Sequence, residues 1–253
     1  MQPLPSPHWQ RRARPWLGTL VEVGIGRGTD ECAVQAAFAA IADVQACLSR
    51  FEPGSDIARF HALAAGGRIA VSEHTAAVLA VAQSLRDASD GLFDVSLGTG
   101  MHDWQCDGDV LHKAGSAVRL DLGGIAKGYA VDQAVEALQA NGCRAGWVNA
   151  GGDLRAFGDV ELPLALRDER GGGVRPFATL ADGAFATSHL GAGSRSQAHW
   201  RARDQAAGAH AHAHASVAAP LCLWADALTK IVAVSGDAHH PLLARHGAAA
   251  WLH

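Results

Sequence analysis

The chain has 253 residues, of which 49% are hydrophobic and 18% charged, and its formal net charge is −4. A chain of this size and apolar content can bury a core in one large domain or two small ones, and its slightly acidic balance argues against a nucleic-acid partner. The five cysteines are scattered, odd in number and without a C-x-x-C pair, which argues against a structural zinc site or a dense disulfide framework.

Residues 1–14 contain prolines and arginines and predict a loose tail, which leaves residues 15–253 for a single domain. The tail has no apolar h-region, so it does not predict a signal peptide. No run approaches eighteen apolar residues, so no membrane span is predicted. We therefore expect a cytoplasmic protein, or a periplasmic and inner-membrane-associated one if a leader is missing from the sequence.

The first third of the domain predicts one strand and three helices. Residues 16–23 alternate between apolar and other side chains, as expected for a strand. Residues 29–49 place apolar side chains at helical spacing, and residues 72–89 predict a second long helix that ends at Asp90-Gly91. Between the two, Ser55 stands at the N-cap position of a short helix.

Phe93, Asp94 and Val95 lie in a segment that glycines flank, Gly91–Gly98. An aromatic side chain next to an aspartate at the start of a strand can line a nucleotide pocket. The structural alternative places Phe93 in the core and Asp94 in a turn. Both interpretations stay open on these residues alone.

The most informative stretch lies in the middle of the chain. Residues 118–122 alternate as a short strand, Gly123-Gly124 break it, and residues 125–141 predict an amphipathic helix with Gly142 at its C-terminal cap. Residues 146–149 predict the next strand, which a second pair of glycines closes before an aspartate.

These glycine turns allow a ligand to come close to backbone amides. Gly123-Gly124 also precede a helix N-terminus, where N–H groups and the helix dipole favour an anion. Lys127 adds a positive charge one turn into the helix. The pattern indicates a phosphate or pyrophosphate site, although the spacing alone fits an ordinary β-α-β unit equally well.

The chain after residue 153 is rich in predicted strands, at residues 159–166, 176–181 and 183–187. A further strand precedes the last long helix, which opens at Ala225-Asp226 and ends at Gly236.

Three histidines, His210, His212 and His214, alternate with alanines. In a strand they would share one face and could bind a transition metal weakly. In a loop they would be solvated histidines, and the low complexity of the segment favours the loop.

Two motifs in close succession resemble those of the ApbE-like FAD:protein FMN transferases. The first, D-L-G-G-I-A-K-G-Y-A-x-D, is matched by Asp121–Asp132, and the second, N-A-G-G-D-L, by Asn149–Leu154. The segment from Leu48 resembles the family pattern L-S-x-[FY]-x-P-x-S-D-I, with His61 where the family has asparagine. Ala225 and the residues after it resemble the motif A-D-A-L.

The resemblance covers the chain from about residue 16 to residue 236 and implies an α+β fold, T-fold-related, with a mixed sheet and flanking helices. It fails mainly in a divergent segment at residues 189–215, where the family motif D-P-R-T-G is absent. Many members are exported lipoproteins, but this chain shows neither an export signal nor a lipobox cysteine.

The activity that the resemblance implies is transfer of FMN from FAD to a threonine or serine hydroxyl of an acceptor flavoprotein, assisted by Mg²⁺, with release of AMP. One alternative is a degenerate member that binds FAD, or hydrolyses it to FMN and AMP, without flavinylating a protein. A second alternative is a binding or scaffold protein of similar shape that holds no flavin.

The resemblance also implies roles for individual residues. His199 corresponds to the proposed base, and an unperturbed histidine has a pKa near 6.5, which suits that role. The residues implied to contact the flavin nucleotide are Leu17, which replaces a methionine against the flat ring, Phe93, Asp94, Val95, Asp121, Lys127 and Trp200.

The implied magnesium ligands are the Gly124 carbonyl, Asp226 and a threonine. The family has that threonine four residues after the aspartate, but here position 230 is lysine and Thr229 stands three residues on. Both positions lie near Asp226 on a helix, so Thr229 could take over the ligand role. The rival hypothesis is that the Lys230 ammonium fills the place of the metal.

Overall fold

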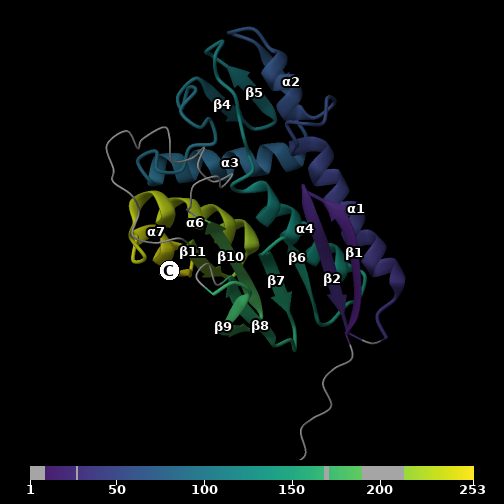
Figure 1. Cartoon of the computed structure of the whole chain (residues 1–253). Helices are drawn as coiled ribbons and strands as arrows, with labels where there is room; N and C mark the ends of the chain where they lie inside the picture. Colours follow the sequence, from purple (N-terminus) through teal and green to yellow (C-terminus); the bar gives the residue numbers. More distant parts are fainter. Residues whose placement is uncertain (1–8, 27, 168–170, 190–213) are drawn as a thin grey trace, which may run out of the picture.

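The computed structural model describes residues 9–26, 28–167, 171–189 and 214–253. Its central feature is a seven-stranded sheet in the order β1-β2-β6-β7-β10-β11-β12, in which every neighbouring pair is antiparallel (Figure 1). The strands are β1 (Gln10–Trp16), β2 (Thr19–Ile25), β6 (Gly146–Ala150), β7 (Asp153–Phe157), β10 (Gly183–His189), β11 (His214–Ala219) and β12 (Ala249–Leu252).

Helices cover one face of this sheet (Figure 1). In that layer, α4 (Ala126–Ala140) contacts β6 and β7, α6 (Cys222–Ser235) contacts β10 and β11, and α1 (Glu31–Leu48) lies against α4. Alternate residues of β2 point into the core between sheet and helices, where Val21 and Val23 are fully buried. A short helix, α7 (Pro241–Arg245), precedes β12.

Two smaller sheets complete the fold. The strands β3 (Arg68–Ala70), β4 (Trp104–Asp107) and β5 (Val110–Lys113) pair in the order β3-β5-β4, beside α2 (Asp56–Ala62) and α3 (Glu73–Ala88). The hairpin of β8 (Leu162–Arg167) and β9 (Val174–Leu180) forms a separate apolar cluster with side chains of the main sheet. This mixed sheet with flanking helices confirms the predicted α+β class.

The predicted helices agree with the structure because their capping residues act as expected. Ser55 Oγ accepts a hydrogen bond from Ala58 N at 3.0 Å at the start of α2. Ser72 Oγ accepts one from Thr75 N at 3.2 Å at the start of α3. Gly142 follows α4 with φ +80°, a conformation that favours glycine over other residues.

Helix α1 is long and apolar enough to cross a membrane by length and composition alone. Its apolar face instead packs in the core against α4 and the sheet. Core helices of globular proteins pass the same length and composition test, so α1 is weak evidence for a membrane span.

Several local predictions are wrong. The strand expected at residues 16–23 is interrupted at Leu17 and Gly18, which form the turn between β1 and β2. His214 lies in β11 and not in the loop that the sequence favours. The expected loose tail at residues 1–14 includes most of β1, an exposed edge strand whose polar side chains give no alternating signal. Residues 118–122 are extended but pair with no strand among the described residues. Their apolar side chains alternate because Val118, Leu120 and Leu122 enter the core, while the N–H groups of residues 119–121 bond to loops and side chains.

Candidate functional site

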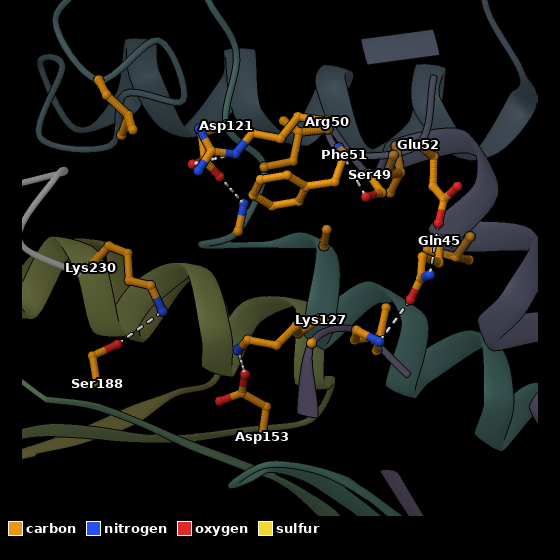
Figure 2. Close-up of a pocket in the computed structure, with 18 of the residues that line it drawn as sticks. Gln45, Ser49, Arg50, Phe51, Glu52, Asp121, Lys127, Asp153, Ser188 and Lys230 are labelled. Carbon is orange, nitrogen blue, oxygen red and sulfur yellow. Dashed lines mark hydrogen bonds and ion pairs between the residues drawn. The ribbon is translucent and has the colours of Figure 1, made fainter. Parts of the chain in front are cut away.

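A cavity of about 840 Å³ opens where the first glycine turn, at Gly123, meets the helical layer (Figure 2). Its walls are the turn between β1 and β2, the end of α1 with the four residues after it, the start of α4, and the ends of β7 and β10. Lys230 of α6 closes the remaining side. Segments that are far apart in the sequence therefore converge on one cavity.

The turn between β1 and β2 places Leu17 in the cavity wall. Leu17 has φ +55° and Gly18 has φ +70°, which is the left-handed backbone of a tight hairpin turn. The Leu17 N–H donates a hydrogen bond to Gln45 Oε1 of α1 at 2.8 Å. A leucine rarely adopts this backbone conformation, so the side chain is held in the wall at a local cost.

Asp121 and the first glycine turn form the opposite wall. Asp121 Oδ1 accepts a hydrogen bond from Gly123 N at 2.9 Å, which fixes the turn into α4. Its other carboxylate oxygen lies 3.5 Å from Arg50 Nε, in a half-exposed ion pair. Arg50 also lies over the ring of Phe51, a residue that is 79% exposed at the cavity wall.

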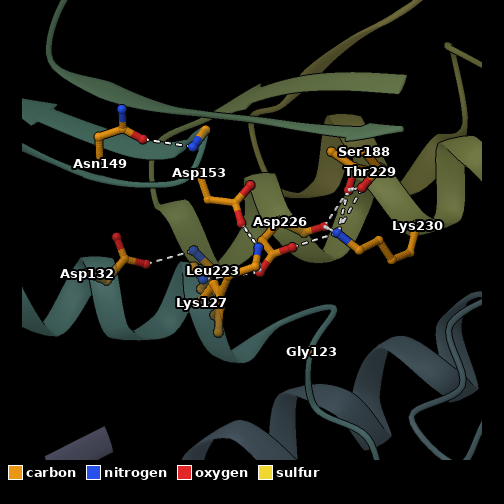
Figure 3. A network of polar contacts seen from close by, with 12 residues as sticks. Gly123, Lys127, Asp132, Asn149, Asp153, Ser188, Leu223, Asp226, Thr229 and Lys230 are labelled. Carbon is orange, nitrogen blue, oxygen red and sulfur yellow. Dashed lines mark hydrogen bonds and ion pairs between the residues drawn. The ribbon is translucent and has the colours of Figure 1, made fainter. Parts of the chain in front are cut away.

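Lys127 lies at the floor of the cavity between two carboxylates. Its ammonium forms an ion pair with Asp153, the first residue of β7, and lies 4.0 Å from Asp226 Oδ2 (Figures 2 and 3). Burial lowers the pKa of Lys127, but the carboxylates of Asp153 and Asp226 outweigh this effect and hold the pKa above its ordinary range. Lys127 is therefore a permanent positive charge.

Lys230 approaches Asp226 from the side opposite to Lys127, within a group of oxygen atoms (Figure 3). Its Nζ is 2.6 Å from Asp226 Oδ1, 3.1 Å from Asp226 O and 3.0 Å from Thr229 Oγ1. Ser188 Oγ of β10, which also contacts Thr229 Oγ1, lies 2.9 Å from the same Nζ. Burial raises the pKa of Asp226, but Lys127 and Lys230 outweigh it, so the pKa lies below its ordinary value.

A comparison with protein-family models decides to which family the chain belongs. The model of the ApbE family matches residues 17–110 and 99–252. The chain belongs to the ApbE family. No curated protein matches it.

Solved ApbE structures share the fold. Flavinyl transferase ApbE of Pseudomonas stutzeri, in its apo form, is 24% identical over 99% of this chain and 92% of its own, with a TM-score of 0.80. The ApbE protein of Thermotoga maritima is 20% identical over 97% and 94%, with a TM-score of 0.83. Flavin transferase ApbE of Vibrio cholerae is 20% identical over 96% and 93%, with a TM-score of 0.81.

The structure of this ApbE-family chain brings together part of the predicted site. Leu17, Asp121 and Lys127 all line the cavity. Asp226 and Thr229 are fully buried behind Lys230, and Gly124 is buried beside the cavity-lining Gly123. His199 and Trp200, as well as His210 and His212, lie outside the described residues, so their roles stay predictions.

Phe93, Asp94 and Val95 form a support behind the cavity. Phe93 and Val95 lie in the core. The Asp94 carboxylate is occupied by hydrogen bonds from Ser96 N, Ser96 Oγ and Gly98 N, at 2.8–2.9 Å. The backbone of this turn reaches the site, because Val95 O accepts from Asp121 N at 2.8 Å. This geometry matches the structural alternative, and a contact with the flavin stays a prediction.

Sequence reasoning missed the cavity residues that follow α1 and those at the end of β10. Arg50, Phe51 and Ser188 line the cavity, and Ser188 also bonds Lys230. The sequence signal for Phe51 was its place two residues before Pro53-Gly54, a pair typical of turns. Residues in turns are usually exposed, so an aromatic side chain there is available to a ligand. Ser188 carries no comparable local signal, since its contact with α6 arises only in the folded chain.

The predicted magnesium ligands do not fit a divalent ion as they stand. Mg²⁺ requires nearly octahedral oxygen ligands at about 2.0–2.1 Å, and it keeps several waters. Here the Lys230 ammonium lies among the oxygens of Asp226 and Thr229. In the part of the chain that the structure describes, no group of three or more His, Cys, Asp or Glu residues is arranged to hold a metal.

Proposed function

We propose that this protein transfers FMN from FAD to a threonine or serine hydroxyl of an acceptor flavoprotein and releases AMP. The observation that carries the proposal is that one cavity offers both positive charges and an exposed aromatic side chain. Two lysine ammoniums and a glycine turn suit a pyrophosphate, and the exposed ring of Phe51 suits a planar ring system. Membership of the ApbE family and the flavinyl transferase of the same fold support it.

The reaction breaks the phosphoanhydride of FAD. The acceptor hydroxyl oxygen attacks the phosphorus of the FMN half, the bond from that phosphorus to the bridging oxygen breaks, and AMP leaves with the bridging oxygen. The hydroxyl proton passes to a base. Such transfers depend mainly on positioning and on neutralising phosphate charge, and Lys127 and Lys230 lie where they can provide that charge.

His199 is the base in this proposal, with Trp200 beside the flavin. The nearest described residues are His189, which lines the cavity, and His214, which pairs with His189 between β10 and β11.

The test uses the purified protein, FAD and a peptide with the D-x-x-[ST]-x-A-T acceptor pattern, with the peptide weighed by mass spectrometry. A gain of one FMN that is lost in His199→Ala supports the transferase and its base. An unchanged acceptor with intact FAD overturns the proposal.

The second candidate function is FAD hydrolysis without transfer. It is favoured by lysine at position 230 and by the missing D-P-R-T-G segment. In the same experiment, release of FMN and AMP with no gain on the acceptor distinguishes hydrolysis from transfer.

A further inference from the structure

The buried cluster at the cavity floor is balanced in charge without any added ion. It consists of Lys127, Asp153, Asp226 and Lys230, which contribute two positive and two negative charges (Figure 3). Asp226 is fully buried, and the Lys230 residue is only 7% exposed. A buried carboxylate needs a positive partner close by, and Asp226 has two.

The Lys230 ammonium is coordinated as a small cation would be. Four oxygens lie within hydrogen-bond distance: Asp226 Oδ1, Asp226 O, Thr229 Oγ1 and Ser188 Oγ. They come from a carboxylate, a backbone carbonyl and two hydroxyls. The hydroxyls are themselves held, because Thr229 Oγ1 lies 2.7 Å from Ser188 Oγ and also donates to Asp226 O at 2.7 Å. These oxygens form a preorganised cage whose centre is the ammonium.

A divalent ion and the ammonium exclude one another in this cage. An ion at the same centre would have to expel Lys230 Nζ from Asp226 and would stand close to the Lys127 ammonium. Two like charges at such separations in a buried site repel strongly. The cage therefore favours the single positive charge of the lysine side chain over the double positive charge of a free divalent ion.

Lysine is rare in this chain, which makes its placement informative. The sequence contains three lysines, Lys113, Lys127 and Lys230, against eighteen arginines. Two of the three lie together at the cavity floor. Arginine carries its charge on a broad planar group, whereas the lysine ammonium is a compact point charge with three donors. Only the compact group matches a cage of four oxygens around one atom.

We propose that the Lys230 ammonium is the resident cation of this site, in place of a divalent metal. Lys230 also lines the cavity, so its positive charge lies close to a ligand bound there. This inference rests on the proposed function for the identity of that ligand, the pyrophosphate of FAD. FAD then binds through Lys230 and Lys127 without magnesium.

The first test needs no FAD. Metal-free protein is titrated with Mg²⁺ in a calorimeter, as the wild type, as Lys230→Ala, which empties the cage, and as Lys230→Met, which fills the space without charge. We expect saturable binding of Mg²⁺ to Lys230→Ala alone. Saturable binding to the wild type that Asp226→Asn abolishes would overturn the inference.

The second test measures FAD affinity in EDTA and in Mg²⁺. The wild type should bind FAD equally in both, within about two-fold. Lys230→Ala should lose about ten-fold or more in EDTA, because a positive charge close to the phosphates is removed, and should recover in Mg²⁺. Lys230→Met should lose as much and not recover.

The control is Lys113→Ala, which removes a buried lysine whose ammonium bonds to His61 O, outside the cavity. It should bind FAD as the wild type does in both conditions. Loss of FAD binding by the wild type in EDTA, with recovery in Mg²⁺, would overturn the Lys230 inference and leave the proposed function intact. Failure of the wild type to bind FAD in either condition would instead overturn the proposed function.

Discussion

Lys127 and Asp153 form an ion pair that joins the two glycine motifs of the chain. Lys127 belongs to the first turn of α4, after Gly123-Gly124, and Asp153 opens β7, after Gly151-Gly152. Lys127 and Asp153 lie 26 residues apart in sequence and meet at the floor of one cavity. The pair thus holds a positive charge in a fixed position at the cavity floor, near the turn of Gly123.

Replacement of Lys127 by methionine should weaken FAD binding and also the fold, because it leaves the buried Asp153 carboxylate without its ion-pair partner. The expected loss in affinity is about 10- to 100-fold, because one charged contact to phosphate disappears. Fluorescence titration of FAD measures the affinity, and urea unfolding measures the stability. Lys113→Met is the matched control, since it removes a buried lysine outside the cavity. Equal losses of FAD affinity in both variants would contradict a ligand role for Lys127.

Phe51 should contribute to FAD binding and not to stability. The residue is 79% exposed and lies at the cavity wall, so the fold gains little from it. Stacking on a flat ring contributes about 1–3 kcal/mol per base in other systems, and Phe51→Ala should therefore reduce FAD affinity about ten-fold or more. Phe51→Trp should preserve the affinity. An unchanged affinity in Phe51→Ala would place the rings of FAD elsewhere.

His61 should make the protein less stable in mild acid. Its Nε2 accepts a hydrogen bond from Leu120 N at 2.8 Å, which requires an unprotonated nitrogen. Burial, and then the charge of Arg119, lowers the pKa of His61 below its ordinary value. The unfolded chain therefore takes up a proton at a higher pH than the folded chain, so stability falls as the pH drops from about 6.5 towards the folded pKa.

The matched variant is His61→Asn, because asparagine can accept the same hydrogen bond and does not titrate. Urea unfolding between pH 8 and pH 5 compares the two proteins. The free energy of unfolding of the wild type should decrease more steeply below about pH 6.5 than that of the variant. Parallel curves would show that His61 has the same pKa in the folded and unfolded chains.

Local signals in the sequence were enough to predict the helices and part of the site. The boundaries of α1, α3 and α4 follow from apolar spacing and from the residues at their ends. The ion pair of Asp226 and Lys230 could be predicted as a rival hypothesis, because the two residues lie one helical turn apart.

Features that depend on distant parts of the chain could not be predicted. Ser188 meets Lys230 only because β10 packs against α6. Residues 118–122 alternate like a strand because the core, and not a neighbouring strand, selects their apolar positions. The polar strand β1 is defined by its pairing with β2, which its own sequence does not show.

Asp132, the last residue of the first motif, caps α6 from the neighbouring helix. Its two carboxylate oxygens accept hydrogen bonds from Cys222 N at 2.9 Å and Leu223 N at 2.8 Å, at the start of α6. Leu221, the N-cap residue of that helix, offers no side-chain acceptor. Arg155 Nη1 donates to Asp132 at 3.0 Å and balances the buried charge.

Asp132→Ala should destabilise the protein by about 3 kcal/mol, because it leaves two buried N–H groups and a guanidinium without their acceptor. Arg155→Met should cost less, about 1 kcal/mol, since the carboxylate keeps both N–H partners. Urea unfolding of the two variants and of the double variant measures these losses and the coupling between them. Equal losses in the single variants would show that Asp132 acts only as the ion-pair partner of Arg155. Because α6 also carries Asp226 and Lys230, loss of the cap should displace the oxygen cage and reduce FAD affinity, whereas loss of Arg155 should leave that affinity nearly unchanged.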